Sequence, residues 1–323
     1  MAECKTSPEV GGMGHSVKRR EDPRFIRGQG NYVDDVVRPG MVFMDIVRSP
    51  YAHAKIKSIN TEKALAHPGV AAVITGETLK EYNLHMMPTL MSDTQMVLPI
   101  EKVCYQSQEV AAVVATDRYS AADGVELVEV EYEPLPVVVD PHKATDPDAP
   151  IIRDDKEGQE NNHIFHWEAG DKSGTDEIFQ NADVTVNKDI YLPRIHVASI
   201  ETCGCVSEFD SVTGQLTVWM TTQAPHAIRT VLALVAGHVG LQEDKIRIIS
   251  PDIGGGFGGK VPVYPGYVIA IAASVVTGLP IKWIEDRREN LQADSFARDY
   301  HMRCEIAADK DGTLNGLRIK TLA

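Results

Sequence analysis

The stretch Asp252-Ile253-Gly254-Gly255-Gly256-Phe257-Gly258-Gly259-Lys260 constrains the fold of this 323-residue chain more than any other. It follows a β-branched run at residues 246–249 and precedes a small-residue apolar run at residues 267–276, a strand–loop–helix order. Five glycines in six positions let the backbone adopt positive φ and approach a ligand closely. Successive N–H groups, with the N-terminus of the next helix, then form a concave anion site. The stretch predicts an α/β unit that binds a phosphate or pyrophosphate group.

Two common phosphate motifs fit this stretch poorly. Val261 stands where a phosphate-binding loop carries a magnesium-binding hydroxyl, and the stretch lies too late in the chain for a first βαβ dinucleotide unit. A flexible turn without a ligand is the alternative. Phe257 favours a binding loop, because an aromatic ring on a pliant loop usually contacts something.

A second signal, Thr221-Thr222-Gln223-Ala224-Pro225-His226, stands at a predicted strand-to-helix junction. There Gln223 faces the carboxyl ends of the strands, where α/β folds bind ligands, and its amide both donates and accepts hydrogen bonds. The alternative is that Gln223 only satisfies loop backbone. For His226, a capping or packing role is favoured over that of a base.

Outward from these motifs, the pattern predicts two units joined by a linker. Residues 21–140 show short strands at 41–47, 54–59, 70–74, 109–114 and 127–132, with helices at 61–66 and 118–127. Residues 141–160 are rich in Pro and Asp and predict the linker. Residues 161–323 show strands at 184–191, 216–220, 246–249 and 281–284, helices at 227–236 and 267–276, and a hairpin around 309–312. Residues 1–20 predict a flexible arm, and the whole predicts an α+β fold.

Composition excludes several classes of protein. Lys plus Arg number 32 against 46 Asp plus Glu, a net charge of −14, which argues against a nucleic-acid binder. No apolar run approaches the roughly 18 residues of a membrane span, and no hydrophobic block marks a secretory signal. Five cysteines without a signal do not indicate a disulfide framework. We therefore expect a cytoplasmic protein with no nucleic-acid partner and no membrane span.

Three polar clusters are predicted to be structural. Cys203-Gly204-Cys205 lacks the second pair of ligands that a zinc site needs, so half-buried strand residues are favoured over a zinc or iron–sulfur site. The charged run at residues 286–290 is predicted to be a solvated face or a local ion-pair network. His163 and His166 flank Phe165, which favours a half-buried strand over a metal site.

These motifs together resemble a known family. Residues 223–226 and 250–260, with Gly28-Gln29-Gly30-Asn31-Tyr32-Val33-Asp34-Asp35 and the stretch at 48–54, are similar to the large subunit of the molybdenum hydroxylases, the xanthine dehydrogenase and aldehyde oxidase family. The likeness runs from about residue 17 to the end. It implies an a/b hammerhead domain followed by the start of a molybdopterin-binding domain.

Within the family, the stretches at 83–90, 162–168, 201–205 and 296–302 resemble the aerobic carbon monoxide dehydrogenases. Val261, where purine- and aldehyde-type members carry Glu, counts against a purine hydroxylase, whereas Gly259 departs from the Asn usual in the carbon monoxide enzymes. The implied reaction is CO + H₂O → CO₂ + 2 H⁺ + 2 e⁻. The alternatives are a hydroxylase of an aldehyde or N-heteroaromatic substrate and a non-catalytic subunit-docking module.

The resemblance also implies roles and partners. Gln223 would hydrogen-bond an oxo ligand of molybdenum, the one catalytic role in this chain, and Gly254, Gly255, Gly256, Phe257 and Gly258 would contact a molybdopterin cytosine dinucleotide. The pterin dithiolene would hold molybdenum, so no side chain is predicted as a metal ligand. An iron–sulfur small subunit and an FAD medium subunit would be the partners, in a dimer of heterotrimers.

The last residues form a predicted strand that stops at Ala323, from which we expect an N-terminal fragment. In the family, the cysteine loop for copper and the catalytic glutamate come later in the chain. Copper is therefore expected only in the complete protein, and the fragment alone is expected to be inactive.

Overall fold

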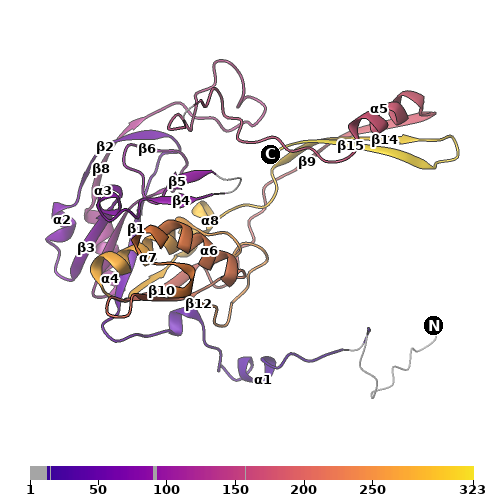
Figure 1. Ribbon diagram of the computed structural model, residues 1–323. Coiled ribbons are helices and arrows are strands. Elements are labelled where there is room, and N and C mark those ends of the chain that lie inside the picture. Colours follow the sequence, from indigo (N-terminus) through magenta and orange to yellow (C-terminus); the bar gives the residue numbers. More distant parts are fainter. Residues whose placement is uncertain (1–12, 15, 90–92, 157) are drawn as a thin grey trace.

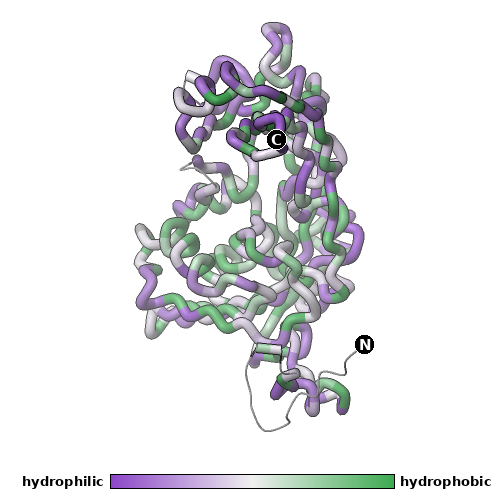
Figure 2. Tube along the Cα trace, turned by 90° about the vertical axis from the view of Figure 1, so that its right-hand side faces the viewer, coloured by the Kyte–Doolittle hydropathy of each residue, from purple (hydrophilic) through white to green (hydrophobic). Residues whose placement is uncertain are grey.

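The computed structural model describes residues 13–14, 16–89, 93–156 and 158–323. They form a body and an arm that projects from it, and the arm consists of residues 172–192 and 300–322 (Figure 1). The flexible N-terminal segment predicted at residues 1–20 is a different part of the chain, and most of it lies outside the described residues. Hydrophobic residues concentrate in the elements of the body, and the region around the C-terminal end is more hydrophilic (Figure 2).

A mixed seven-stranded sheet forms the centre of the body, in the order β12-β11-β10-β13-β1-β7-β3. Its strands are β1 (Val42–Arg48), β3 (Val70–Thr75), β7 (Glu109–Ala115), β10 (Gly204–Asp210), β11 (Gln215–Met220), β12 (Ile246–Ile249) and β13 (Ile281–Ile284). The pairs β11–β12 and β1–β13 are parallel and the other neighbours are antiparallel. Because β1 pairs with β13, strands from both predicted units share one sheet.

Helices cover both faces of this sheet. On one face lie α6 (Pro225–Ala236) and α7 (Pro265–Thr277), and on the other α2 (Glu62–Leu65) and α4 (Arg118–Leu127). Strand β7, next to the edge strand β3, is buried along its whole length, with Ala112 and Val114 in the larger core and Ala111 and Val113 in the smaller one. Burial on both faces explains the continuous apolar run at 109–115.

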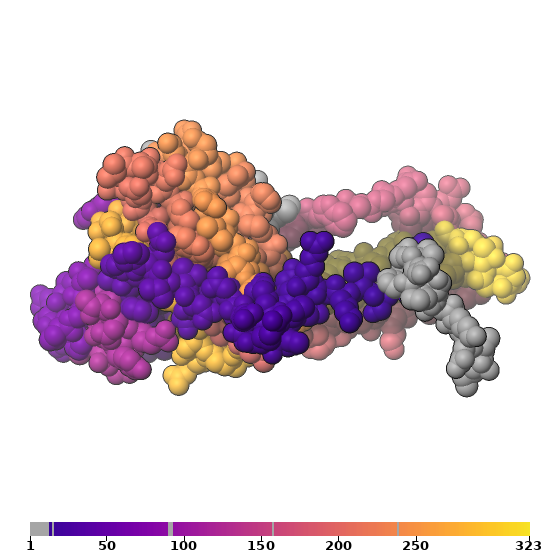
Figure 3. Space-filling view, turned by 90° about the horizontal axis from the view of Figure 1, so that it is seen from below, coloured from indigo at the N-terminus to yellow at the C-terminus, as the bar shows by residue number. Residues whose placement is uncertain are grey.

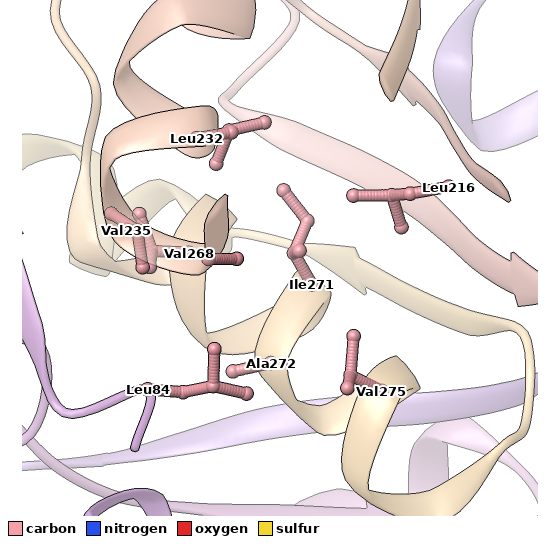
Figure 4. Close-up of a pocket in the computed structure, with 9 residues that line it drawn as sticks. Leu84, Leu216, Leu232, Val235, Val268, Ile271, Ala272 and Val275 are labelled. Carbon is pink, nitrogen blue, oxygen red and sulfur yellow. The ribbon is translucent and has the colours of Figure 1, made fainter. Parts of the chain in front are cut away.

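Close packing of α7 against the sheet depends on a glycine. A Cβ atom at Gly266 would lie 2.3 Å from the ring of Trp283 in β13, and that ring meets Tyr267 edge-on with centroids 5.5 Å apart. Between α6, α7 and β11 a small gap remains, lined only by aliphatic side chains that include Leu216, Leu232 and Ile271 (Figure 4). No polar group lines this gap, so it is a packing defect rather than a ligand site.

Smaller elements complete the body. A three-stranded sheet β6-β2-β8 and a two-stranded sheet β4-β5 accompany the main sheet. Their strands and the remaining elements of the body are β2 (Ala54–Asn60), β4 (Met86–Pro88), β5 (Thr94–Met96), β6 (Lys102–Val103), β8 (Glu129–Pro134), α1 (Asp22–Phe25), α3 (Gly76–Glu81), α8 (Arg287–Ala293), η1 (Val33–Asp35), η3 (Gly237–Val239) and η4 (Glu243–Lys245).

The arm is a three-stranded antiparallel sheet of β15 (Leu314–Leu322), β14 (Tyr300–Ala308) and β9 (Val184–Leu192), with α5 (Lys172–Asn181) against one face. The helix covers the face of Gly316, because a Cβ there would meet Ile178 at 3.0 Å. Val186, Ile306 and Leu317 face one another across the strands on the opposite face, and all three are exposed. The apolar face of the arm is therefore uncovered.

The α+β fold and most of the elements predicted within residues 25–323 are confirmed. The helix at 118–127 and the strand at 281–284 match to the residue, and the hairpin around 309–312 is present. The strand proposed around His163 and His166 is wrong: residues 163–169 form neither helix nor strand, and both histidines are exposed.

The predicted linker at 141–160 has turns but neither helix nor strand among its described residues. It is held in place by Asn162, whose carboxamide accepts from the Ile152 N–H at 2.8 Å and donates to the carbonyls of Ala144 and Pro150. The predicted domain boundaries at residues 20, 140 and 160 remain predictions.

No helix among the described residues has the length and apolar character needed to cross a bilayer.

Candidate functional site

The glycine loop, residues 254–260, connects β12 to α7 and has an unusual backbone. Gly255 and Gly258 have φ of +101° and +92°, and Phe257 adopts φ +51°. Glycine takes such values without the steric penalty that a Cβ brings. The Phe257 side chain is 77% exposed, so it contacts little of this chain.

Gln223, just after β11, meets the glycine loop. Its carboxamide oxygen Oε1 accepts hydrogen bonds from the N–H groups of Gly258 (3.0 Å) and Lys260 (3.3 Å). Its backbone N–H donates to the Lys260 carbonyl at 2.9 Å. Oε1 is therefore occupied by hydrogen bonds from the loop. The Nε2 amide group has no acceptor in the described part of the chain and is available to donate to a ligand. The structure thus brings together the two motifs that the sequence singled out.

Several loop N–H groups are also free. Gly254, Gly258, Gly259 and Lys260 donate within the chain, whereas no described residue accepts from the N–H groups of Gly255, Gly256 or Phe257. These three consecutive donors lie beside a side-chain amide with a free NH₂. Such an array can bind an anionic or oxygen-rich ligand.

Glu201 fastens the first glycine of the loop. Its oxygen Oε2 accepts from the Gly254 N–H at 2.7 Å and from the Lys260 ammonium at 2.9 Å. Lys260 is only 2% exposed, so its charge is turned inward. The carboxylate and the ammonium therefore form one ion pair beneath the loop.

The N-terminal segment lies across the surface of the body (Figure 3) and reaches Asp252, two residues before the loop. Arg24 in α1 pairs with the carboxylate of Asp252, which also accepts from the Asn31 N–H at 2.8 Å. The guanidinium of Arg24 lowers the pKa of Asp252 below its ordinary value. This pairing joins the start of the chain to the entrance of the glycine loop.

A buried acidic group lies nearby, formed by Cys203, Glu285 and Asp294. Asn290 donates to Asp294 at 2.6 Å and the Cys203 N–H donates to Glu285 at 3.1 Å. Burial, followed by the carboxylate of Asp294, raises the pKa of Glu285 to about 9, and burial raises the pKa of the Cys203 thiol. Each carboxylate thus accepts from a donor of this chain, and burial favours the protonated form of Glu285.

Other predicted candidates take structural positions. Cys205 lies in β10 and Cys203 directly before it, and both are fully buried rather than half-buried. In the charged run, Asp286 caps α8 and Glu289 pairs with Arg48 at 2.7 Å. The run is structural, as predicted: it forms a local ion pair and a helix cap, with Asn290 buried and Asp286 and Arg288 exposed.

His226 occupies the first turn of α6 with an exposed side chain. Sequence reasoning missed Glu201, which lies 53 positions before Gly254, and the buried carboxyls of Glu285 and Asp294. No spacing pattern connects these residues to the glycine stretch.

Two family models match this chain. The molybdopterin cofactor-binding domain matches residues 155–323, and the a/b hammerhead domain of aldehyde oxidase and xanthine dehydrogenase matches residues 27–136. Together they account for most of the sequence and for both the glycine loop and Gln223, which lie within the first of these matches.

The similar proteins include carbon monoxide dehydrogenase large chains. The chain is 58% identical over 99% of its length to the large chain from Afipia carboxidovorans and 54% identical over 97% to that from Hydrogenophaga pseudoflava. The crystal structure of a Cu,Mo-CO dehydrogenase in its carbon monoxide reduced state superposes with a TM-score of 0.90, 56% identity and 98% of this chain covered. The chain spans about 40% of the length of each of the three. It belongs to the molybdenum hydroxylase family of the xanthine dehydrogenases and aldehyde oxidases.

Proposed function

We propose that this chain forms the N-terminal part of the molybdenum-cofactor-binding catalytic subunit of an aerobic carbon monoxide dehydrogenase, which oxidises CO with water to CO₂, two protons and two electrons. Identities of 54–58% to two such large chains over nearly the whole of this chain support the substrate. Because those chains are much longer, the activity belongs to the complete protein, and the 323-residue chain alone is expected to be inactive.

The observation that carries the proposal is the set of unused donors around the glycine loop. The N–H groups of Gly255, Gly256 and Phe257 and the Nε2 amide of Gln223 have no acceptor in the described part of the chain. A Cβ at Gly256 would lie 2.5 Å from the Gln223 carboxamide, and one at Gly258 would meet nothing within 4 Å. The loop therefore has no room for a side chain at Gly256, beside Gln223. It leaves open space at Gly258, where the pterin and its phosphates would lie in this proposal.

In this proposal the residues of the chain bind and orient the cofactor. When bound, the molybdenum–pterin group supplies two-electron redox chemistry. Gln223 would donate a hydrogen bond from Nε2 toward an oxygen ligand of the metal, since Oε1 is held by the loop. The loop N–H groups would donate to anionic parts of the cofactor, as preorganised donors do in a catalytic site. Phe257, which is 77% exposed, would cover the cofactor and exclude water.

Further parts of the proposal concern the complete protein. We assign the cytosine dinucleotide form of the cofactor, with copper bound by a later segment, and Cu,Mo-CO dehydrogenase among the structural matches supports the copper. An iron–sulfur small subunit and an FAD medium subunit would accept the electrons, in a dimer of heterotrimers. A cytoplasmic location agrees with the unpaired Cys203 and Cys205, both buried.

The test uses the complete parent protein, purified with its partner subunits. We expect molybdenum and pterin in the protein and CO-dependent reduction of a dye. The variant Gln223→Glu keeps the acceptor for the loop but replaces the donor, so CO oxidation is expected to fall about 10²-fold. Gln242→Glu, an exposed residue before η4, is the matched control and should retain full activity.

Three results would contradict the proposal: a parent protein without molybdenum and pterin, full CO oxidation by Gln223→Glu, or CO oxidation by the 323-residue chain. The first of these favours a docking module. Oxidation of an aldehyde or N-heteroaromatic compound in place of CO would assign a different substrate within the family.

A further inference from the structure

We propose that Glu201 and Lys260 act as a pair of positioning residues that hold the glycine loop and, through it, the carboxamide of Gln223. One carboxylate oxygen, Oε2 of Glu201, accepts from the N–H of Gly254 and from the ammonium of Lys260, at 2.7 and 2.9 Å. These are the two ends of the loop. The inference rests on the proposed function, since it concerns the loop assigned to the cofactor.

The contact at Gly254 is reciprocal and close. The Glu201 N–H donates back to the Gly254 carbonyl at 3.2 Å. A Cβ at Gly254 would lie 2.5 Å from Cβ of Glu201, so a side chain at this position would push the two segments apart. The first glycine of the loop is therefore required for contact with Glu201.

Lys260 transmits this contact to Gln223. Its backbone N–H and carbonyl are both bonded to Gln223, at 3.3 and 2.9 Å, while its ammonium reaches Glu201. Displacing the ammonium therefore displaces the backbone that orients the Gln223 amide. The pair acts through Gln223 and need not touch the cofactor.

The direction of the Lys260 side chain excludes a more obvious role. A lysine at the end of a glycine-rich loop commonly binds phosphate as a point charge. Here the side chain is 2% exposed and its ammonium is paired with Glu201 beneath the loop. Recognition of cofactor anions thus falls to the backbone N–H groups, and Lys260 contributes a neutralised charge that fixes the loop.

Glu201 is itself held in place by its neighbours. Arg287 donates to the carbonyls of Ser199 and Ile200, at 2.5 and 2.7 Å, and Thr202 donates to the carbonyl of Glu285 at 2.6 Å. The segment before β10 is therefore anchored to α8 and to the end of β13. A fixed carboxylate can restrain a loop, whereas a mobile one cannot.

The first experiment compares amide hydrogen exchange in the complete parent protein and its variants. Glu201→Gln keeps an acceptor for Gly254 but leaves the buried ammonium unpaired, which is strongly unfavourable. We expect exchange of the hydrogen-bonded N–H groups of Gly254, Gly258 and Lys260 to accelerate at least tenfold, with β11 unchanged. The double variant Glu201→Gln/Lys260→Met removes both charges and should return loop exchange to within about threefold of the original. Glu243→Gln, in an exposed ion pair with Arg229, is the control.

Recovery of loop exchange in the double variant distinguishes the positioning role of the pair from general destabilisation of the fold. General destabilisation would become worse, not better, with a second substitution. Unchanged loop exchange in Glu201→Gln, equal acceleration in β11, or a double variant no better than the single one would each overturn the inference. If Glu201→Gln does not fold, a folded double variant with protected loop amides still supports the pair. Failure of both to fold overturns it, since the pair would then be needed for folding rather than positioning.

A second measurement distinguishes this inference from the proposed function. In the complete parent protein, Glu201→Gln is expected to lower bound molybdenum at least fivefold, and the double variant to restore most of it. A parent without molybdenum contradicts the proposed function but leaves the exchange result standing. A loaded parent whose loop exchange does not respond to Glu201→Gln contradicts this inference alone.

Discussion

Gly256 lies directly against the carboxamide of Gln223: a Cβ at position 256 would be 2.5 Å from Cδ and 2.6 Å from Oε1. No side chain fits there unless Gln223 moves. Because Oε1 also accepts from the N–H groups of Gly258 and Lys260, moving Gln223 breaks the bonds that shape the loop. The absence of a side chain at Gly256 therefore allows both the conformation of the loop and the position of the Gln223 amide beside it.

The substitution Gly256→Ala is therefore expected to displace Gln223 and lower the free energy of unfolding by about 1–3 kcal/mol, the usual range for overpacking. Gly237→Ala is the matched control, since a Cβ there meets nothing within 4 Å and the backbone needs no positive φ. Urea denaturation measures both. Equal stability of the two variants would contradict the close contact.

The meeting of Gln223 with the glycine loop could be predicted from the sequence because of one topological rule. Parallel neighbouring strands end at the same edge of a sheet, and β11 and β12 are parallel neighbours, with Trp219 opposite Ile249. The segments that follow them therefore begin side by side. The residue types were also informative: the glycines indicated a backbone free to adopt unusual conformations, and the glutamine indicated a polar side chain at the end of a strand.

Glu201 could not be predicted in the same way. It precedes β10, which runs antiparallel to β11, so the start of β10 reaches the same edge as the end of β11. That conclusion needs the strand order, which local periodicity does not contain. The parallel pairing of β1 with β13 could not be predicted for the same reason, because it joins residues some 240 positions apart.

Arg48 provides a stability test in the core between β1, β7 and α8. It is 11% exposed at its side chain and pairs with Glu109 at 2.9 Å and Glu289 at 2.7 Å. Arg48→Met leaves two buried carboxylates without their cation, which costs about 3–5 kcal/mol of unfolding free energy. Arg303→Met breaks an exposed pair with Asp189 and should have little effect in the same urea titration. Similar losses for the two variants would show that the Arg48 cluster is not buried.

Glu285 predicts a pH dependence with a definite sign. Burial and then the carboxylate of Asp294 raise the pKa of Glu285 from its ordinary 4.5 to about 9. Between these values the folded state holds a proton that the unfolded chain has lost, so this group's contribution to stability is complete below pH 4.5 and declines as pH rises to about 9. Glu285→Gln cannot ionise and avoids that decline. Its stability relative to the original protein should therefore increase with pH.

The measurement is urea denaturation of Glu285→Gln and the original protein at pH 5, 7 and 9. The stability difference is expected to grow by a few kcal/mol over this range, with a limiting slope of about 1.4 kcal/mol per pH unit. Glu62→Gln replaces an exposed glutamate and serves as the control, with a difference that stays nearly constant. Parallel pH curves for Glu285→Gln and the original protein would mean that Glu285 is ionised in the folded state.

The uncovered face of the arm predicts self-association of the 323-residue chain. Val186 and Ile319 are 60% and 52% exposed on the face opposite α5, in the two outer strands of the sheet. Apolar faces and open strand edges of this kind favour pairing with another chain. Val186→Lys/Ile319→Lys places two charges there and should shift sedimentation profiles toward monomer at a given concentration. Thr185→Lys/Asn187→Lys adds the same charge to the other face of β9 and should associate as the original does. Only the Val186→Lys/Ile319→Lys variant interrupts the row that Val186 forms with Ile306 and Leu317. An equal reduction of association in both double variants would therefore mean that net charge, and not the apolar face, governs association.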